Sequence, residues 1–440
     1  MNAPVRKLDL EDRGVLRFIT AGSVDDGKST LIGRLLYEAK GIYADQLAAV
    51  TRATRKRTAG DGLDLSLLTD GLEAEREQGI TIDVAYRYFA SPVRKFIIAD
   101  APGHEQYTRN MVTGASTADA AIVLVDVTRV GTGELLPQTK RHSAIAKLLG
   151  IRHIIVAVNK IDLVGFDRAV FDHVRAEYSA IAARLGLRDV HYIPISALEG
   201  DNVVRPSART PWYDGPPLLE LLETLPAERT DAIEPLRYPV QLVIRANGSA
   251  VDDFRGYAGQ VRSGVLKCGQ MIRVLPGGET ARVASIETLD RRLDDAVAGR
   301  SVTVRLDRDV DVSRGDVIVD ADDHPRLAKQ FEAELCWLDR TPLDPRRKYL
   351  LRHAAKTMQV RVDAVAGKLD VHSLSAAVVA DTLVMNDIGR VSLTTQQPII
   401  CDVHARLPAT GAFILIDAAT NQTSAAGMIM GRVDDATGAA

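Results

Sequence analysis

Short apolar runs alternate with longer amphipathic stretches from about residue 15 to residue 225. A typical unit is the run LRFITAG at 16–22, followed by LIGRLLYEA at 31–39, where apolar positions recur at helical spacing. Four further apolar runs of strand length lie at 95–100, 120–127, 152–159 and 190–196. Near-continuous apolar strands separated by helices indicate a mostly parallel sheet covered on both faces. We therefore expect a doubly wound α/β domain with its ligand site at the carboxyl ends of the strands.

The pattern changes after residue 226. Residues 226–239, PAERTDAIEPLRYP, contain three prolines and mixed charges, which is typical of a linker. Beyond them, short alternating segments punctuated by glycine and free of long helical stretches indicate all-β domains. The polar stretch DADDHPRLA at 320–328 suggests a second boundary. We predict an α/β domain at 1–230 and two β-barrel domains at 231–325 and 326–440.

Composition narrows the function classes. The 440 residues include 55 Lys plus Arg and 58 Asp plus Glu, so the formal net charge is −3, and aromatic residues make up 5%. A nucleic-acid binder would usually show a basic excess and aromatic stacking platforms, so we expect no nucleic-acid partner. The three cysteines, Cys268, Cys336 and Cys401, are far apart and suggest neither a disulfide framework nor a zinc site.

The start of the chain, MNAPVRKLDLEDRG, contains acids and lacks the apolar stretch of a signal peptide. No apolar run approaches the ~20 residues that a membrane span requires. We expect a cytoplasmic protein without a membrane partner.

Residues 22–29, GSVDDGKS, fit the phosphate-binding pattern G-x-x-x-x-G-K-[ST] between a predicted strand and a predicted helix. Gly22 and Gly27 accept backbone angles that let N–H groups wrap phosphate oxygens, and the helix start favours the same anion. Lys28 is expected to reach the β- and γ-phosphates, and the Ser29 hydroxyl to bind Mg²⁺. The expected nucleotide contacts here are Gly22, Ser23, Val24, Asp25, Asp26, Gly27, Lys28, Ser29 and Thr30.

Asp25 and Asp26 are unusual neighbours for a triphosphate because they carry the same sign of charge. Either a bound cation or an outward orientation of both side chains would offset the repulsion. The sequence leaves these two alternatives open.

The motif Asp100-Ala101-Pro102-Gly103 ends the strand predicted at 95–100. A carboxylate at a strand end can hold Mg²⁺ through water, and the N–H of Gly103 can donate to a γ-phosphate. The D-x-x-G pattern is weak alone and gains weight from its place after a strand and after the P-loop.

Two motifs point to guanine. Asn159, Lys160, Ile161 and Asp162 form N-K-I-D at the end of a third strand. The Asp162 carboxylate can accept hydrogen bonds from guanine N1–H and N2–H₂, whereas adenine offers no such pair of donors. The Lys160 stem can pack on the base. Ser196-Ala197-Leu198, after a fourth strand, can bring a backbone N–H to guanine O6, so the ordered set of motifs predicts GTP and GDP as ligands.

Two further residues are candidates for hydrolysis. Thr81 lies between the P-loop and the D-x-x-G strand, where its hydroxyl could complete the Mg²⁺ shell and sense the γ-phosphate. The alternative is an ordinary strand threonine. His104 directly follows Gly103 and is the candidate that orients the attacking water; the alternative is a structural histidine. The predicted catalytic residues are His104, Lys28 and Thr81, and the predicted Mg²⁺ ligands are Ser29, Thr81 and Asp100.

The whole chain resembles the translational GTPases of the elongation factor Tu type, which have a G domain followed by two β-barrels. More closely, it is similar to the family of large, GTP-hydrolysing subunits of bacterial sulfate adenylyltransferase. The segments that carry this resemblance are 21–40, 70–89, 95–116, 196–203 and 211–220. It implies a heteromer in which a small catalytic subunit converts ATP and sulfate into adenosine 5′-phosphosulfate and diphosphate. GTP hydrolysis in the large subunit would drive that uphill reaction.

The sequence departs from the family pattern in two ways, and it lacks a feature that some relatives carry. Ala101 replaces a threonine common at that position, and we expect little effect because the position is a spacer. The segment 126–142 is longer and less regular, and we expect it to bear on the partner and to leave the nucleotide contacts unaffected. No second P-loop pattern follows residue 30, so we do not expect the adenylylsulfate kinase step of fused relatives.

Two rival functions remain open at this point. An elongation-factor-type GTPase that delivers tRNA would need a basic surface, for which the best candidates are Arg346, Arg347, Lys348, Arg352 and Lys356. A solvated edge or a rim facing a protein partner explains the same residues. A GTP-dependent regulatory module is the second rival, because a switch and an energy transducer need the same phosphate sensors.

Overall fold

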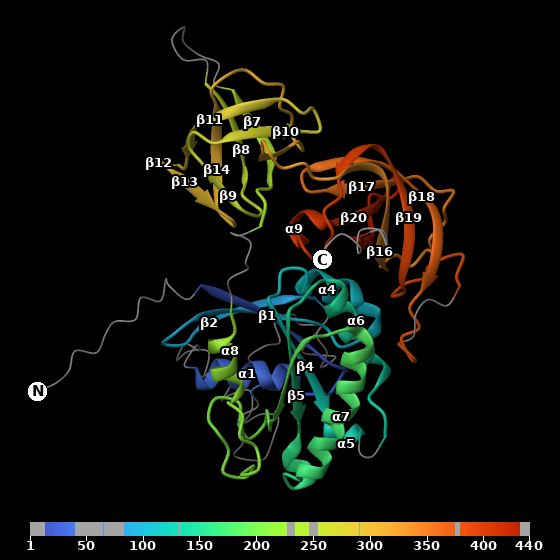
Figure 1. Ribbon diagram of the computed structural model, residues 1–440. Helices are drawn as coiled ribbons and strands as arrows, with labels where there is room; N and C mark the ends of the chain where they lie inside the picture. The colour runs from blue at the N-terminus through green and yellow to red at the C-terminus, as the bar shows by residue number, and fades with distance from the viewer. Residues whose placement is uncertain are drawn as a thin grey trace, which may run out of the picture. The chain divides into compact units, whose positions relative to one another are not determined.

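The computed structural model describes residues 14–39, 65, 83–130, 133–226, 234–245, 254–289, 291–374 and 379–431 (Figure 1). The chain divides into two compact units. The first is Met1–Ala227 with Asp370–Ser375, and the second is Glu228–Leu369 with Ala376–Ala440. Each unit has its own hydrophobic core.

The first unit is built on a six-stranded sheet of order β2-β3-β1-β4-β5-β6. Its strands are β1 (Val15–Ala21), β2 (Ala85–Ala90), β3 (Lys95–Asp100), β4 (Ala120–Asp126), β5 (His153–Asn159) and β6 (Asp189–Pro194). All neighbours pair in parallel except β2 and β3. Strands β4 and β5 are buried along their whole length, as expected for central strands covered on both faces.

Helices cover both faces of this sheet (Figure 1). The helices are α1 (Lys28–Glu38), α4 (Thr108–Ala115), α5 (Val127–Val130), α6 (Pro137–Leu148), α7 (Arg168–Leu185) and α8 (Leu218–Thr224). Helices α1 and α8 share one apolar cluster with strand residues such as Phe18 and Ile98, while α4, α6 and α7 contact β1, β4 and β6 respectively. Short 3₁₀ turns, η2 (Glu105–Tyr107) and η3 (Ile161–Val164), follow β3 and β5.

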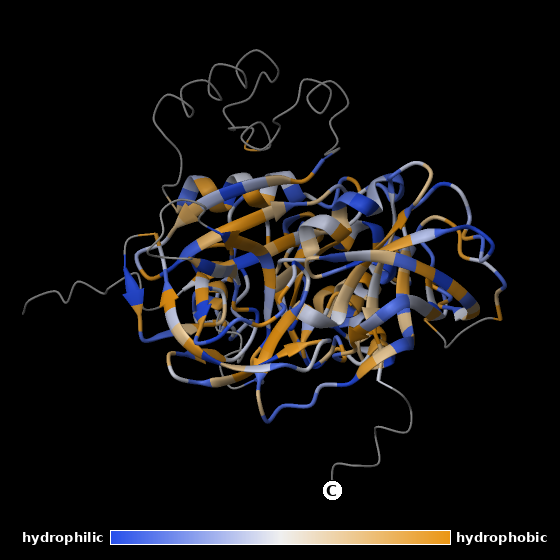
Figure 2. Cartoon of the chain, turned by 90° about the horizontal axis from the view of Figure 1, so that it is seen from above, coloured by the Kyte–Doolittle hydropathy of each residue, from blue (hydrophilic) through white to orange (hydrophobic). Residues whose placement is uncertain are grey.

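The second unit contains two groups of antiparallel strands. The first group is β7 (Tyr238–Arg245), β8 (Arg255–Gln260), β9 (Val265–Lys267), β10 (Met271–Leu275), β11 (Thr280–Glu287), β12 (Arg292–Leu293), β13 (Asp295–Val297), β14 (Ser301–Leu306) and β15 (Val317–Asp320). Strand β10 pairs with both β15 and β11, which closes the main sheet of this group into a ring. Figure 2 shows hydrophobic and hydrophilic positions interspersed along the strands, as expected for strands with one face in a core.

The second group forms a closed barrel of order β16-β19-β18-β17-β20-β21. Its elements are β16 (Leu327–Trp337), β17 (Tyr349–His353), β18 (Lys356–Lys368), β19 (Ile388–Ile400), β20 (Ala412–Asp417), β21 (Thr423–Ile429) and the short helix α9 (Pro408–Gly411). Arg237, which is almost fully buried, donates from Nε to Asp402 at 2.8 Å and also pairs with Asp323, so it joins the two groups of strands. The predicted fold class, a mostly parallel α/β domain followed by β-barrel structure, is confirmed.

Within the described residues, no helix combines the length and the apolar character that crossing a bilayer requires.

Candidate functional site

The sequence motifs gather at one edge of the sheet. The P-loop follows β1, the D-x-x-G motif ends β3, the N-K-I-D motif follows β5, and Ser196-Ala197-Leu198 lies just after β6 (Figure 1). Because these strands are parallel neighbours or next-neighbours, their carboxyl ends meet at the same edge.

The P-loop has the backbone that a phosphate cradle requires. Gly22 and Gly27 have φ values of 154° and 94°, in a region that costs L side chains free energy. A Cβ added at Gly27 would lie 2.4 Å from the side-chain nitrogen of Asn159, so glycine is also needed for space. Gly27 is the N-cap of α1, and no side chain caps that helix start. The first N–H groups of any α-helix have no intrahelical partner, and those of α1 also lack a side-chain cap. They therefore form a site suited to an anion.

Lys28 lies in the centre of this cradle. Its Nζ donates to the carbonyl oxygens of Gly22 at 3.0 Å and Ser23 at 2.7 Å, and its side chain is buried. Burial lowers the pKa of the Lys28 ammonium, and the charges of Asp26, Asp100 and Asp25 oppose that shift. A Cβ at Gly103 would lie 2.4 Å from Lys28 Nζ, which shows that the two phosphate motifs are in contact.

The two aspartates of the P-loop have different environments. Asp25 is exposed and has a φ of 67°, whereas Asp26 is buried and its Oδ2 accepts the N–H of Ser23 at 2.5 Å. Burial raises the pKa of Asp26, and Lys28, the Ser23 N–H and Arg129 oppose the shift. Arg129 Nη1 lies 3.6 Å from Asp26 Oδ1 and donates to Val24 O at 2.6 Å. Of the two alternatives left open by the sequence, the outward orientation applies to Asp25, whereas the buried Asp26 has the cations Lys28 and Arg129 beside it.

The D-x-x-G motif leads from a buried strand to an exposed turn. Asp100 is buried and accepts a hydrogen bond from the Thr20 hydroxyl at 3.2 Å. His104 is exposed and caps η2, because its Nδ1 accepts the N–H of Gln106 at 3.3 Å. Glu105, the next residue, pairs with Arg141 of α6 at 2.8 Å. Thr81 lies outside the described residues.

One side chain connects the P-loop to the two motifs predicted to bind guanine. Asn159 donates from Nδ2 to Asp26 O at 2.7 Å, and its Oδ1 accepts the N–H of Ala197 at 3.0 Å. Arg34 of α1 supports the same loop by donating to the carbonyl oxygens of Ala197, at 3.2 Å, and of Leu198. These contacts hold the N-K-I-D and Ser-Ala-Leu motifs beside the cradle.

Lys160 and Asp162 occupy the turn that follows β5. Lys160 has a φ of 63°, and its Nζ contacts Asp126 Oδ2 at 2.7 Å. Burial acts to raise the pKa of Asp126, but hydrogen bonds from Lys160 and Thr128 outweigh it and hold that pKa below its usual value. Asp162 is half-buried in the first turn of η3. The Asp162 carboxylate therefore lies on the same turn as Lys160, whose ammonium is held by Asp126.

Four contacting residues could not be recognised from the sequence: Arg34, Asp126, Arg129 and His142. His142 of α6 is buried, and its Nδ1 accepts the N–H of Gly22 at 3.1 Å. The expectation that the segment 126–142 leaves the nucleotide contacts unaffected stays a prediction. Within this segment, Arg129 and His142 both form hydrogen bonds with the P-loop backbone. No local signal marks them, since these contacts join residues more than 100 positions apart.

We expect His142→Ala to destabilise the folded chain, because the buried N–H of Gly22 would lose its acceptor, at a cost of about 1–3 kcal/mol. Burial, with Lys28 and Arg141 nearby, lowers the pKa of His142 from 6.5 to about 3. Below pH 6.5 the unfolded chain therefore binds a proton here that the folded chain does not. This site then removes about 1.4 kcal/mol of stability per pH unit as the pH falls from about 6 towards 3.

Urea unfolding of the wild type and of His142→Ala between pH 7 and pH 4.5 measures this pH dependence of the free energy of unfolding. The free energy of unfolding of the wild type should fall more steeply with acid than that of His142→Ala. Equal slopes in the two proteins would contradict the neutral, buried state of His142.

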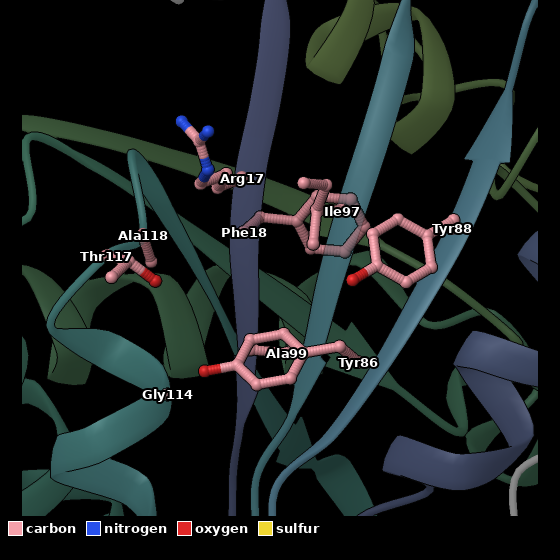
Figure 3. Close-up of a pocket in the computed structure, with 9 residues that line it drawn as sticks. All are labelled: Arg17, Phe18, Tyr86, Tyr88, Ile97, Ala99, Gly114, Thr117 and Ala118. Atoms are coloured by element: carbon pink, nitrogen blue, oxygen red, sulfur yellow. The ribbon is translucent and has the colours of Figure 1, made fainter. Parts of the chain in front are cut away.

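A separate hollow of about 290 Å³ lies on the sheet between β1, β2, β3 and α4 (Figure 3). Tyr86 and Tyr88 of β2 stand opposite Ala99 and Ile97 of β3, and Arg17 stands opposite Ile97 on the other side. None of the motif residues lines this hollow.

Comparison with known families agrees with this geometry. The family model of the elongation factor Tu GTP-binding domain matches residues 13–228, and that of the GTP-eEF1A C-terminal domain-like family matches residues 330–430. The GTPase-like domain of S. cerevisiae Ski7, solved with GDP and inorganic phosphate, superposes with a TM-score of 0.51 at 16% identity. That superposition covers 96% of this chain and 98% of the Ski7 chain, and it bears on the fold alone.

Curated relatives are much more similar in sequence. Sulfate adenylyltransferase subunit 1 of Cellvibrio japonicus is 50% identical over 96% of this chain and 87% of its own length. The corresponding protein of Shewanella oneidensis is 50% identical over 96% and 86%. The bifunctional enzyme CysN/CysC of Mycobacterium tuberculosis is 52% identical over 94% of this chain and 67% of its own length. The resemblance identified from the sequence is confirmed, and the chain belongs to the sulfate adenylyltransferase subunit 1 family of elongation factor Tu-like GTPases.

Proposed function

We propose that this chain is the GTP-hydrolysing, energy-coupling subunit of a cytoplasmic sulfate adenylyltransferase. GTP hydrolysis here drives a separate small subunit to form adenosine 5′-phosphosulfate and diphosphate from ATP and sulfate. The observation that carries the proposal is the contact between Lys28 and the backbone at Gly103, which joins two phosphate motifs within a chain of this family. The division into domains at 1–230, 231–325 and 326–440 is part of the proposal.

The nucleotide contacts are assigned by motif. The turn from Gly22 to Thr30 surrounds the phosphates, and the backbone from Asp100 to His104 faces the γ-phosphate. Asp162 accepts the N1–H and N2–H₂ groups of guanine, Lys160 packs on the base, and the Ser196-Ala197-Leu198 loop faces O6. The buried Lys28 ammonium supports the first assignment, because its hydrogen bonds go to neutral carbonyl oxygens and a phosphate beside it would add a strong charge-assisted partner.

Mg²⁺ would be held by the Ser29 hydroxyl, by Asp100 through water and by Thr81. The donors are hard oxygens, as Mg²⁺ prefers, and no group of three or more acidic, His or Cys side chains that could hold a metal occurs in the described part of the chain. Such a sparse protein donor set fits an ion that depends largely on phosphate oxygens and water. When bound, the ion neutralises charge on the β- and γ-phosphates.

Hydrolysis is assigned to an in-line attack of water on the γ-phosphate. His104 is exposed on the turn that follows Gly103, so its imidazole can orient that water, while Lys28 stabilises the charge that develops on the phosphate. The naming of the relatives as subunit 1 of sulfate adenylyltransferase supports the existence of a partner subunit.

The test measures GTP hydrolysis by this chain with its cognate small subunit, in the presence and absence of ATP and sulfate, together with the diphosphate released. We expect the GTPase rate to rise with ATP and sulfate and to track diphosphate in a fixed ratio. This chain alone should bind GTP, hydrolyse it slowly and form no adenosine 5′-phosphosulfate. A GTPase rate indifferent to both substrates would contradict energy coupling, and diphosphate release without proportional GTP use would indicate a regulatory switch.

The tRNA-delivery alternative rests on the basic run around β17. Arg347 of that run pairs with the buried carboxylate of Asp417 at 2.8 Å, so part of its charge is used within the barrel. An aminoacyl-tRNA binding assay, before and after charge reversal of Arg346, Lys348 and Arg352, tests whether the other basic side chains of this run bind tRNA. We expect no tRNA binding by either protein.

A further inference from the structure

The turn that carries Asp162 continues into a strained residue. Phe166 has a φ of 60°, which is a conformational outlier for a bulky side chain. Its N–H donates to Ile161 O at 2.9 Å, which closes the turn around Asp162. Such strain persists only where surrounding contacts fix the backbone.

Two side chains from the segment 199–217 supply these contacts. Trp212 Nε1 donates to Phe166 O at 3.0 Å, and its ring packs against Phe171 of α7 with centroids 5.3 Å apart. The Arg209 guanidinium lies 4.4 Å from the centre of the Phe166 ring. The strained backbone of Phe166 is thus held by its carbonyl oxygen and by its ring.

Arg209 also contacts the loop that follows Ser196. Its Nε donates to Asp201 Oδ1 at 3.0 Å, and its terminal nitrogens pair with Asp201 and Glu199. Asp201 O in turn accepts the N–H of Ser196 at 3.2 Å, and the N–H of Glu199 donates to Ser196 Oγ at 3.2 Å. One guanidinium therefore connects the Asp162 turn with the Ser196-Ala197-Leu198 loop.

The segment that carries Arg209 is itself anchored to the end of β6. Asn202 is buried, and its Nδ2 donates to Pro194 O at 2.8 Å and to the Thr210 hydroxyl at 2.9 Å. The N–H of Ser207 donates to Asn202 Oδ1 at 2.8 Å. Arg209 and Trp212 thus project from a fixed support.

We propose that Arg209 and Trp212 are positioning residues for guanine recognition: they fix the Asp162 turn relative to the Ser196-Ala197-Leu198 loop. The inference rests on the proposed role of Asp162 in binding the base. A base held by a carboxylate on one loop and by a backbone N–H on the other is bound tightly only if the two loops keep these groups at the right distance and orientation relative to each other. The side chain of Arg209 is 45% exposed, so its ion pairs contribute little to global stability.

The experiment compares guanosine with inosine nucleotides, because inosine lacks the 2-amino group and offers Asp162 only N1–H. We expect Arg209→Ala to weaken the binding of GTP and GDP by about 10-fold, mainly through faster dissociation. The binding of ITP and IDP should weaken by much less. The ratio of GTP to ITP affinity should fall several-fold, while the hydrolysis rate per bound GTP and the Tm of the protein stay unchanged. Trp212→Phe keeps the packing on Phe171, removes the Nε1–H donor and should change the ratio in the same direction.

Arg175→Ala is the matched control. The Arg175 guanidinium lies 5.9 Å from the Phe171 ring centre and pairs with Asp172, so it has the same kinds of contact on α7 without bridging the two loops. Arg209→Lys keeps the charge but loses the planar guanidinium that stacks on the Phe166 ring. Its affinity for GTP should therefore lie between those of the wild type and Arg209→Ala.

Unchanged GTP/ITP ratios in both Arg209→Ala and Trp212→Phe would overturn the positioning role, as would an equal fall in the Arg175→Ala control. Asp162→Asn separates this failure from that of the proposed function. If that variant keeps its preference for guanine, the assignment of Asp162 is wrong. If it changes its base preference while the Arg209 and Trp212 variants keep theirs, only the positioning role fails.

Discussion

Asp162→Asn is expected to exchange the preference for GTP for a preference for xanthosine triphosphate. In the proposed site the carboxylate of Asp162 accepts two donors from guanine, and an amide would place its own N–H₂ against the 2-amino group. Xanthine has a 2-oxo group that accepts from the amide while its N1–H still donates to the side-chain oxygen. Because a site built to pair polar groups strongly rejects a ligand that leaves them unpaired, we expect GTP affinity to fall by about 100-fold or more.

Competition binding of GTP against xanthosine triphosphate measures this change. Asp167→Asn is a matched control five residues along the chain. Asp167 caps α7 by accepting the N–H of Ala169 at 2.7 Å, and asparagine serves equally well as an N-cap. The control should keep GTP preference and stability, and unchanged GTP affinity in Asp162→Asn would remove Asp162 from base recognition.

His104→Ala is expected to retain GTP binding and to slow hydrolysis by a factor of about 100 or more. A positioned general acid–base or water-orienting group typically contributes 10²–10⁴-fold. His104 is exposed and its Nδ1 accepts from Gln106, so we expect the hydrogen bonds of Lys28 within the P-loop to remain when the imidazole is removed. Single-turnover hydrolysis of bound GTP, measured with the GTP dissociation constant, separates the two effects.

His104→Asn is the control that isolates chemistry from local structure. His104 caps η2 through Nδ1, and alanine would also remove that cap. Asparagine is a favourable capping residue but cannot replace the imidazole. Both variants should therefore hydrolyse GTP slowly, and a wild-type rate in His104→Asn would assign His104 a capping role alone.

The local sequence pattern was sufficient for the central strands and for the motifs that follow them. The strand predicted at 95–100 coincides with β3, and that at 152–159 differs from β5 by one residue. Both strands lie inside the sheet, so most of their positions are apolar and the pattern is unambiguous. β2 was not predicted, because it is an edge strand whose residues are mostly exposed or half-buried.

What only the tertiary structure decided is which side chains hold the predicted motifs together. His142 reaches Gly22 across 120 positions, and Arg34 reaches Leu198 across 164. The buried Asp26 has a compensating cation in Arg129, which is likewise distant in the chain. The sequence by itself determined the central strands, the motifs and the family, because each depends on neighbours in the chain. The supporting contacts depend on neighbours in space, which a linear pattern does not contain.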